Sequence, residues 1–288
     1  MSKLKKLQSA SNAQKSGSIL VLLGLAMLVL WRSGQGQSVP YQATGHYYAS
    51  FDGTRIYYET AGSGPAVVLL HGFANTGEVW KKIALYQELQ QAGFELIIPD
   101  LRGNGKSDKP HNPAAYLRDA EARDVMGILK RMGIHHYGLV GYSRGSIIAA
   151  RLLVLDPRVT RVVLGGMGPG FTDPAWPRRI MFYRALMGDS VPELAPLVRY
   201  VQQQGLDRRA LALQQFGQPS TSPKELAAVR KPVLVICGDQ DQDNGSGKAL
   251  AALIPGAQFR TVPGDHPGAM HSAQFSSLVA TFLEGKEL

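Results

Sequence analysis

The stretch that decides the fold of this chain is Val140-Gly141-Tyr142-Ser143-Arg144-Gly145-Ser146. It contains a Gly-x-Ser-x-Gly pentapeptide, which a strand-forming run, 137–140, precedes and an apolar helical run, 147–155, follows. A strand that turns sharply into a helix holds the serine hydroxyl on a strained turn, and the two glycines let neighbouring backbone pass close by. The N-terminal N–H groups of the helix favour negative charge at the same place. Although the pentapeptide also occurs by chance in turns, this context predicts that Ser143 is a nucleophile.

Short apolar runs alternate with helical patterns along the rest of the chain. Two β-rich runs, 45–50 and 55–60, are joined by Asp52-Gly53 and predict a hairpin. The further expected strands are 66–70, 94–98, 137–140, 159–164, 233–237 and 259–262. The expected helices are 78–91, 113–132, 147–155 and 273–283. This alternation predicts an α/β fold, with a mostly parallel sheet covered by helices on both faces.

The alternation stops between about residues 165 and 230, where seven prolines occur. Short helical patterns such as 178–187 are found there, and no strand is expected. We interpret this span as a helical lid insertion over the sheet edge at which Ser143 emerges. The expected organisation is an N-terminal segment and linker, a first core part, the lid and a second core part, with the boundaries 1–40, 41–166, 167–229 and 230–288.

Two further side chains are needed, because a serine hydroxyl is a poor nucleophile without a base and the base needs an orienting acid. In sheet proteins of this type they follow later strands, in the order serine, acid, histidine. His266 comes soon after the run 259–262 and is the expected base, since the nearby His271 falls on the flank of the last helix. The run 233–237 is followed by three alternating aspartates. On these residues alone, the acid is one of Asp239, Asp241 and Asp243.

Two backbone N–H groups are expected to stabilise the negative charge that develops on the substrate oxygen, forming an oxyanion hole. The N–H of Arg144 directly follows the nucleophile in the chain. The N–H of Phe73, on the loop after the run 66–70, is the natural second donor.

Residues 43–288 resemble the α/β-hydrolase fold family. The resemblance rests on five motifs, His71-Gly72-Phe73, Asp100-Leu101-Arg102-Gly103-Asn104-Gly105-Lys106-Ser107, Gly141-Tyr142-Ser143-Arg144-Gly145, Gly238-x-x-Asp241 and Gly264-Asp265-His266. The D-x-R-G-x-G-x-S loop is a hallmark of the branch that contains esterases, epoxide hydrolases and C–C hydrolases. The resemblance implies that Asp241, in the G-x-x-D motif, is the acid. Ser143 separates the chain from the halide- and epoxide-cleaving enzymes, which use aspartate as the nucleophile.

Two positions depart from the family pattern around the nucleophile. Arg144 stands where methionine or leucine is common, and Ser146 stands where glycine is usual. Arg144 brings a cation close to the site. Two interpretations are open: the side chain holds an anionic group, or it pairs with a nearby carboxylate.

The basic character of the chain is concentrated near its first residue. The net charge is +9, and no acid precedes Asp52, whereas five cations do, namely Lys3, Lys5, Lys6, Lys15 and Arg32. Removing these five leaves +4 for the rest, which shows no dense run of Lys and Arg. Nucleic-acid binding is therefore not expected.

Lysines before the uncharged stretch 16–31 are typical of an export signal. No small-x-small cleavage site follows this stretch, and no cysteine is available there for lipid attachment. We therefore expect residues 18–31 to anchor the protein in a membrane, with the catalytic domain on the extracytoplasmic side. The alternative is export after cleavage of the signal.

Other motifs do not support a nucleotide or metal site. Residues 103–107 end like a phosphate-binding loop, but Asp100 stands where that motif requires glycine. Residues 239–243 resemble the start of a calcium loop, but the turn glycine and the bidentate glutamate are missing. No metal or cofactor is expected. The single cysteine, Cys237, suits a buried apolar position.

Together these features predict a serine hydrolase that cleaves a carboxylic ester through an acyl-enzyme. Alternatives on the same triad are a C–C bond hydrolase, a thioesterase or an aminopeptidase-like activity, and the non-enzymatic alternative is a binding protein on a hydrolase scaffold. The lid mixes apolar residues with arginines, which suits a small-molecule ester or lipid-like substrate with a medium acyl chain, and an anionic surface. Trp176 and Phe182 are the candidate substrate contacts, although such residues also suit ordinary packing between lid and core.

Overall fold

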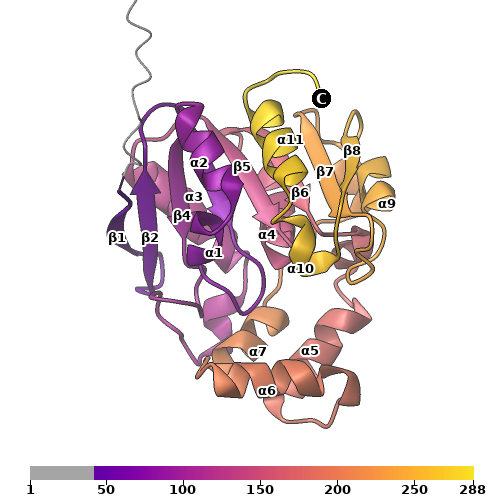
Figure 1. The fold of residues 1–288 in the computed structure, drawn as a ribbon. Helices are drawn as coiled ribbons and strands as arrows, with labels where there is room; N and C mark the ends of the chain where they lie inside the picture. The colour runs from indigo at the N-terminus through magenta and orange to yellow at the C-terminus, as the bar shows by residue number, and fades with distance from the viewer. Residues whose placement is uncertain (1–41) are drawn as a thin grey trace, which may run out of the picture. The chain divides into compact units, whose positions relative to one another are not determined.

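The structure, a computed structural model, describes residues 42–288. Within them, one sheet has the strand order β1-β2-β4-β3-β5-β6-β7-β8 (Figure 1). The strands are β1 (Thr44–Ala49), β2 (Arg55–Ala61), β3 (Ala66–Leu70), β4 (Glu95–Pro99), β5 (Tyr137–Tyr142), β6 (Val159–Gly165), β7 (Val233–Gly238) and β8 (Gln258–Val262). The β1–β2 and β2–β4 pairs are antiparallel, and the other pairs are parallel.

The N-terminal segment and membrane anchor predicted over residues 1–40 lie outside the described residues. Across residues 42–288 themselves, the structure contains no helix with both the length and the apolar character that a membrane span requires.

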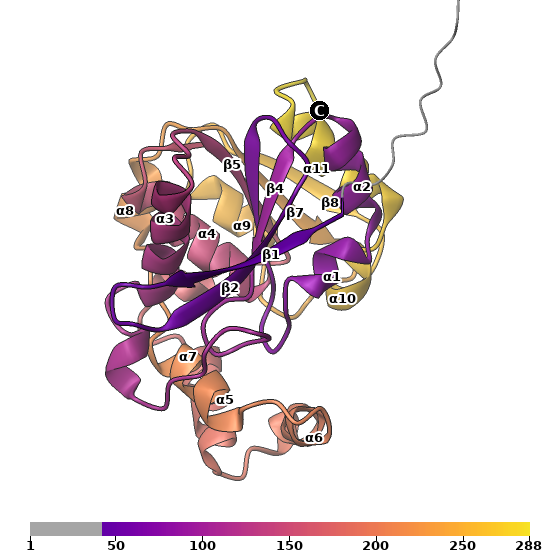
Figure 2. The same cartoon turned by 90° about the vertical axis from the view of Figure 1, so that its left-hand side faces the viewer.

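Helices cover both faces of the sheet (Figures 1 and 2). One face carries α3 (Ala120–Arg131), α4 (Arg144–Leu155), α8 (Pro223–Ala227) and α9 (Gly247–Ala252). The other carries α1 (Glu78–Lys81), α2 (Ala84–Gln91), α10 (His266–Ala269) and α11 (Ala273–Leu283). Every residue of β3, β5 and β7 is buried, which explains their continuous apolar sequences. The observed layers confirm the predicted fold class.

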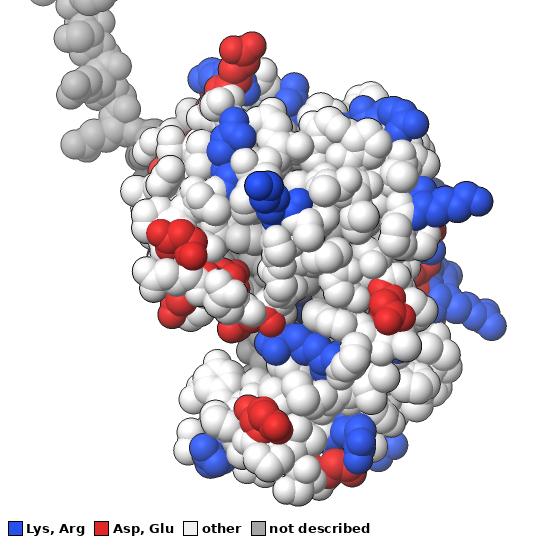
Figure 3. Space-filling model, turned by 90° about the vertical axis from the view of Figure 1, so that its right-hand side faces the viewer, with Lys and Arg blue, Asp and Glu red and all other residues white. Residues whose placement is uncertain are grey.

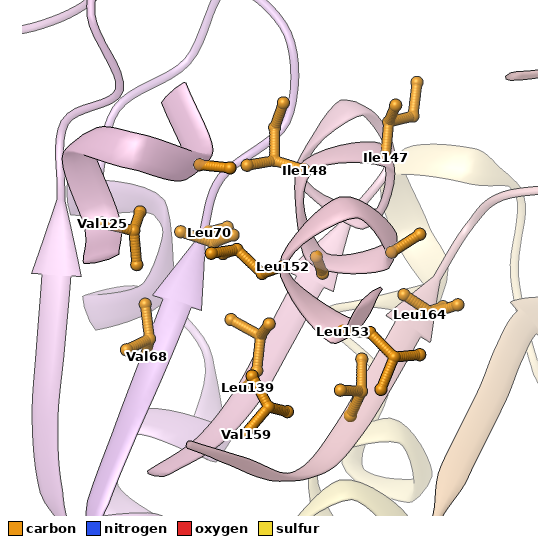
Figure 4. Close-up of a cluster of buried hydrophobic side chains, with 14 of the residues drawn as sticks. Val68, Leu70, Val125, Leu139, Ile147, Ile148, Leu152, Leu153, Val159 and Leu164 are labelled. Atoms are coloured by element: carbon orange, nitrogen blue, oxygen red, sulfur yellow. The ribbon is translucent and has the colours of Figure 1, made fainter. Parts of the chain in front are cut away.

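The core beneath the site is built mainly on α4. Ile148 and Leu152 of this helix belong to one buried cluster with Val68, Leu139 and Leu164 of the central strands (Figure 4). This packing fixes the helix against the strands on either side of it. The turn between β5 and α4 is therefore held by the largest apolar cluster in the described part of the chain.

Two helices predicted as single elements are each broken in two. The helix predicted over 78–91 is α1 followed by α2, because Ile83 between them is extended, with φ −119° and ψ 154°. The helix predicted over 113–132 is a 3₁₀ turn followed by α3, because Arg118 and Asp119 have φ values of 58° and 57°. Tertiary contacts fix both breaks, since Ile83 is buried in the core and the Asp119 carboxylate pairs with an arginine of α4.

The chain between β6 and β7 leaves the sheet, and this described span contains no strand, as predicted. Its helices are α5 (Pro177–Met187), α6 (Ala195–Gln203), α7 (Arg208–Phe216) and α8. Helices α5, α6 and α7 pack around Leu186, Val201 and Leu211 and lie together beyond the ends of the strands (Figures 1 and 2). Helix α8 instead packs beside α4 on the sheet.

The D-x-R-G-x-G-x-S loop connects neighbouring segments of the core. The two carboxylate oxygens of Asp100 accept hydrogen bonds from the N–H groups of Gly77 and Lys106, both at 2.8 Å. The Ser107 hydroxyl donates to the Asp100 carbonyl at 2.6 Å and accepts from the N–H of Tyr57 at 2.8 Å. The loop thereby ties strand β2 to the segment after β3.

The arginine of the same loop is buried and neutralised. Nε and Nη2 of Arg102 donate to the Asp124 carboxylate of α3 at 2.7 and 2.6 Å, and Nη1 donates to Asp52 at 2.9 Å. The Ser50 hydroxyl also donates to Asp124, at 2.5 Å. A buried guanidinium is tolerated because its donors meet carboxylates in this way. The loop therefore supports the core, and none of its residues lines the cavity beside Ser143.

Candidate active site

Ser143 occupies the turn between β5 and α4. Its φ of 53° and ψ of −123° are strained for a residue other than glycine. A side chain on Gly141 would overlap the carbonyl oxygen of Gly145, and a side chain on Gly145 would overlap the carbonyl oxygen of Leu70. The N–H of Ser143 donates to the carbonyl of Gly165 at 2.8 Å. Only glycine fits on either side of this turn, as the pentapeptide predicted.

Ser143, His266 and Asp241 form one hydrogen-bonded chain. Nε2 of His266 lies 2.9 Å from Oγ of Ser143, and Nδ1 lies 2.8 Å from Oδ2 of Asp241. Asp241 follows β7, and His266 is the first residue of α10 after β8. A carboxylate at Nδ1 favours the tautomer with hydrogen on that nitrogen. Nε2 is then free to accept the serine proton.

Of the three alternating aspartates, Asp241 alone contacts His266. The Asp239 carboxylate accepts from the N–H of Gly264 at 2.9 Å, and Asp243 is exposed at the rim of the cavity. Burial raises the pKa of Asp241, but the hydrogen bond and charge of His266 outweigh burial and hold this pKa below its ordinary value. Asp241 therefore remains ionised at neutral pH and can stabilise a protonated imidazole.

Three residues whose role the sequence did not indicate surround His266. The Tyr142 hydroxyl donates to the backbone carbonyl of His266 at 2.6 Å, and the two rings lie 5.5 Å apart. A side chain on Gly166 would approach within 3.0 Å of the His266 ring. The side-chain amide of Asn244 donates to the Gly166 carbonyl at 3.0 Å. Only the folded chain brings these residues together, so their spacing in the sequence carries no signal.

Phe73 and Arg144 both line the cavity. Arg144 is the first residue of α4, so its N–H has no acceptor within the helix. The peptide before Phe73 is held by the fully buried ring of His71, whose Nδ1 lies 2.8 Å from the Gly72 carbonyl and whose Nε2 accepts from the N–H of Leu101 at 3.0 Å. The C=O and N–H of a trans peptide point in opposite directions. This contact therefore turns the Phe73 N–H away from the histidine.

A cavity of about 350 Å³ opens beside Ser143 and His266. The core contributes Phe73, and α5 with the residue before it contributes Phe182 and Trp176, the two candidate substrate contacts. The rings of Phe73 and Phe182 meet edge to face, with centroids 5.7 Å apart. The volume falls in the range of small-molecule sites in proteins.

The Arg144 side chain pairs with a carboxylate. Nη1 and Nη2 donate to the two oxygens of Glu121 at 2.7 and 2.6 Å, and Nη2 also donates to the carbonyl of Gln214 at 3.1 Å. Both charged side chains are 4% exposed. Of the two interpretations left open by the sequence, the second describes Arg144. The pair links the turn at Ser143 to α3 and α7.

Replacing Arg144 by methionine is expected to lower the free energy of unfolding by about 3–5 kcal/mol, because Glu121 is left buried without its partner. The second variant Arg144→Met/Glu121→Gln removes the stranded charge and should recover part of this loss. Equilibrium unfolding in urea measures both. Equal stability of Arg144→Met and the unaltered protein would contradict the structural role of the pair.

Ser146, the second departure from the family pattern, is fully buried. Its hydroxyl lies 2.9 Å from the carbonyl oxygen of Gly141 and 2.8 Å from that of Gly165. Its single proton can be donated to either carbonyl, at the end of β5 or at the end of β6.

The remaining candidate groups make no hydrogen bond to Ser143, His266 or Asp241. His271 precedes α11, on the flank of the last helix as expected, and lines the cavity. Cys237 is a free, buried thiol. Among the residues that the structure describes, no group of three or more His, Cys, Asp and Glu side chains could hold a metal ion.

Comparisons with known proteins agree with the observed fold. A family model described as alpha/beta hydrolase fold matches residues 65–199. Epoxide hydrolase 3 of Siraitia grosvenorii is 38% identical over 112 residues, which cover 39% of this chain and 35% of that protein. The chain thus spans about a third of the length of the curated relatives it matches.

Solved structures agree over a larger part of the chain. An esterase from Exiguobacterium antarcticum has a TM-score of 0.70 at 21% identity, covering 84% of this chain and 100% of that one. An esterase from Rhodococcus sp. ECU1013 has a TM-score of 0.62 at 28% identity, covering 84% and 99%. The chain is an α/β-hydrolase-fold protein.

Proposed function

We propose that the protein is a serine hydrolase that cleaves carboxylic esters through an acyl-enzyme. The observation that carries this proposal is the hydrogen-bonded chain of Ser143, His266 and Asp241 at the wall of a small-molecule-sized cavity. Relatives named as epoxide hydrolases and esterases support hydrolysis in general. The serine favours the ester, because in this fold the epoxide-cleaving enzymes that the chain resembles use aspartate as the nucleophile.

In the first half of the proposed reaction, Ser143 attacks the ester carbonyl while Nε2 of His266 takes the hydroxyl proton. Asp241 orients the imidazole and stabilises its positive charge. The N–H groups of Phe73 and Arg144 donate to the oxyanion of the tetrahedral intermediate. His266 then returns the proton to the departing alcohol as the C–O bond breaks.

In the second half, a water molecule attacks the acyl-enzyme and gives its proton to Nε2 of His266. The tetrahedral intermediate collapses, the carboxylic acid leaves, and the proton returns to Oγ of Ser143. We assign the helices α5 to α7 to the role of a lid. Trp176 and Phe182 would then exclude bulk water from the acyl group and supply apolar contacts to it.

The proposal is tested with a panel of substrates that share a similar size. We expect hydrolysis of p-nitrophenyl butyrate, covalent labelling by a fluorophosphonate, and an acyl adduct on the peptide that contains Ser143 when the reaction is quenched with acid and examined by mass spectrometry. Styrene oxide, a thioester and an aminoacyl anilide should react more slowly. Faster turnover of any of these, or the absence of an acyl adduct, would contradict an ester hydrolase.

A further inference from the structure

One cation in the cavity wall makes no hydrogen bond and no ion pair with the described residues. Arg178 is half-buried and lines the cavity, and its charge helps to lower the pKa of Asp241, but no acid within residues 42–288 lies close enough to pair with it. Its guanidinium lies over the ring of Phe182, 4.8 Å from the centroid. Stacking on an aromatic face holds a guanidinium in place while leaving its N–H donors free. The side chain is therefore positioned but unpaired.

The other two arginines of the wall are already committed. Arg144 is neutralised by Glu121. Arg179 donates to three backbone carbonyls, those of Gln215, Pro174 and Phe216, at 2.7, 2.8 and 2.6 Å. Three of the five N–H donors of Arg179 are thus used within the protein. The lid side of the cavity carries two positive charges, and Arg178 is the one whose donors are all free for an anion.

The backbone of α5 adds to the positive electrostatic potential on the lid side of the cavity. Helix α5 begins at Pro177, and its first turn faces the cavity through Arg178 and Arg179. The partial positive charge of a helix N-terminus favours an anion at this place. No side chain caps this helix end. The acid in the cavity wall is Asp243, which is exposed, and the nearby Asp241 is bonded to His266.

Arg178 and Ser143 line the same cavity. Phe182, which carries the guanidinium, meets Phe73 edge to face, and the N–H of Phe73 is a proposed oxyanion donor. Figure 3 shows basic side chains at the hollow between the helices of the insertion and the part that carries the sheet. The positive charge and the nucleophile therefore face the same small cavity.

We propose that Arg178 binds a carboxylate of the substrate, so that the preferred ester is an anionic half-ester of a dicarboxylic acid. This inference rests on the proposed ester hydrolysis. A guanidinium matches a carboxylate through two parallel N–H···O bonds. One uncommitted guanidinium suits a monoanion, and the apolar wall between it and Ser143 suits the methylene chain between the two carbonyl groups.

The test compares esters that differ only in the distal charge. The anionic set is monomethyl succinate, adipate and suberate, and the neutral set is methyl butanoate, hexanoate and octanoate. We expect kcat/KM for the best anionic ester to exceed that of its neutral counterpart about tenfold or more. In Arg178→Gln this ratio should fall by about 10–100-fold, and Arg178→Lys should retain part of it.

The matched control is Arg184→Gln. Arg184 lies on the same helix, is exposed and pairs with Asp189, so its loss should leave the ratio of the two ester sets unchanged. If Arg178→Gln and the unaltered protein show the same ratio of kcat/KM for the two ester sets, the proposal is overturned. This holds even if the kcat/KM values of both sets fall together.

A binding measurement separates this proposal from the proposed function. Calorimetry on the full-length Ser143→Ala variant should show that monomethyl adipate binds more tightly than methyl hexanoate, and that the added change Arg178→Gln removes the difference. If no ester is hydrolysed but this difference exists, ester hydrolysis is wrong and the carboxylate site stands. If esters are hydrolysed but the difference is absent, the carboxylate site is wrong and ester hydrolysis stands.

Discussion

Ser143→Ala is expected to lower kcat for ester hydrolysis by about six orders of magnitude and to abolish labelling by a fluorophosphonate. The reason is that the proposed reaction passes through a covalent bond to Oγ, the one hydroxyl of residues 42–288 that is hydrogen-bonded to the ring of His266. Nε2 of His266 lies 2.9 Å from this oxygen, so removing it leaves the base without its proton donor. Residual turnover would come only from binding and from the oxyanion donors.

Two controls make the Ser143→Ala result specific. Ser220→Ala removes another half-buried hydroxyl, which lies at hydrogen-bond distance from the carbonyls of Phe171 and Thr172 and does not line the cavity, so labelling should persist. The unfolding transition in urea should show that Ser143→Ala remains folded. Labelling that survives in Ser143→Ala would show that a different residue is the nucleophile.

The fold was largely predictable because its buried strands are recognisable as continuous apolar runs in the sequence. A continuous apolar run such as 233–237 belongs in a sheet that is covered on both faces, and the hairpin was marked by Asp52-Gly53. The helix breaks were not predictable, because they depend on distant partners. Asp119 adopts a left-handed conformation, and its carboxylate meets Arg151, thirty-two residues further along the chain.

The parts of the site that directly follow a strand could be predicted from the sequence. Ser143 and His266 each follow a strand, and the sheet brings those ends together. The choice among the three aspartates required the conformation of the loop, because aspartates two residues apart have nearly the same local sequence. The partner of Arg144 was equally hidden, because Glu121 lies on a different helix.

The two arginines near the site have different consequences for substrate choice. Arg144 adjoins the nucleophile, but Glu121 neutralises its charge, so Arg144 does not select an anionic substrate. Arg178 belongs to the insertion, where its charge remains available to a ligand. Selectivity for charge would then be set by α5, which can vary without disturbing the strained turn at Ser143. The catalytic chain and the proposed specificity would be separable by mutation.

Asp241→Asn is the second change with a large expected effect, a fall in kcat of about four orders of magnitude. The carboxylate accepts from Nδ1 of His266 at 2.8 Å and thereby leaves Nε2 free to accept the serine proton. An amide can donate to Nδ1 and so favours the opposite tautomer, in which Nε2 carries the hydrogen and cannot act as a base. The substitution also removes the negative charge that stabilises the protonated imidazole of His266.

The neighbouring aspartate supplies the matched control for this prediction. Asp239→Asn changes the same functional group two residues away, and its amide oxygen can still accept from the N–H of Gly264, so kcat should remain within a few-fold of the unaltered protein. Steady-state kinetics with p-nitrophenyl butyrate distinguish the two variants. A large loss in Asp239→Asn together with a small loss in Asp241→Asn would reverse the assignment of the acid. That outcome would require the loop after β7 to rearrange when substrate binds, because only Asp241 reaches His266 in this structure.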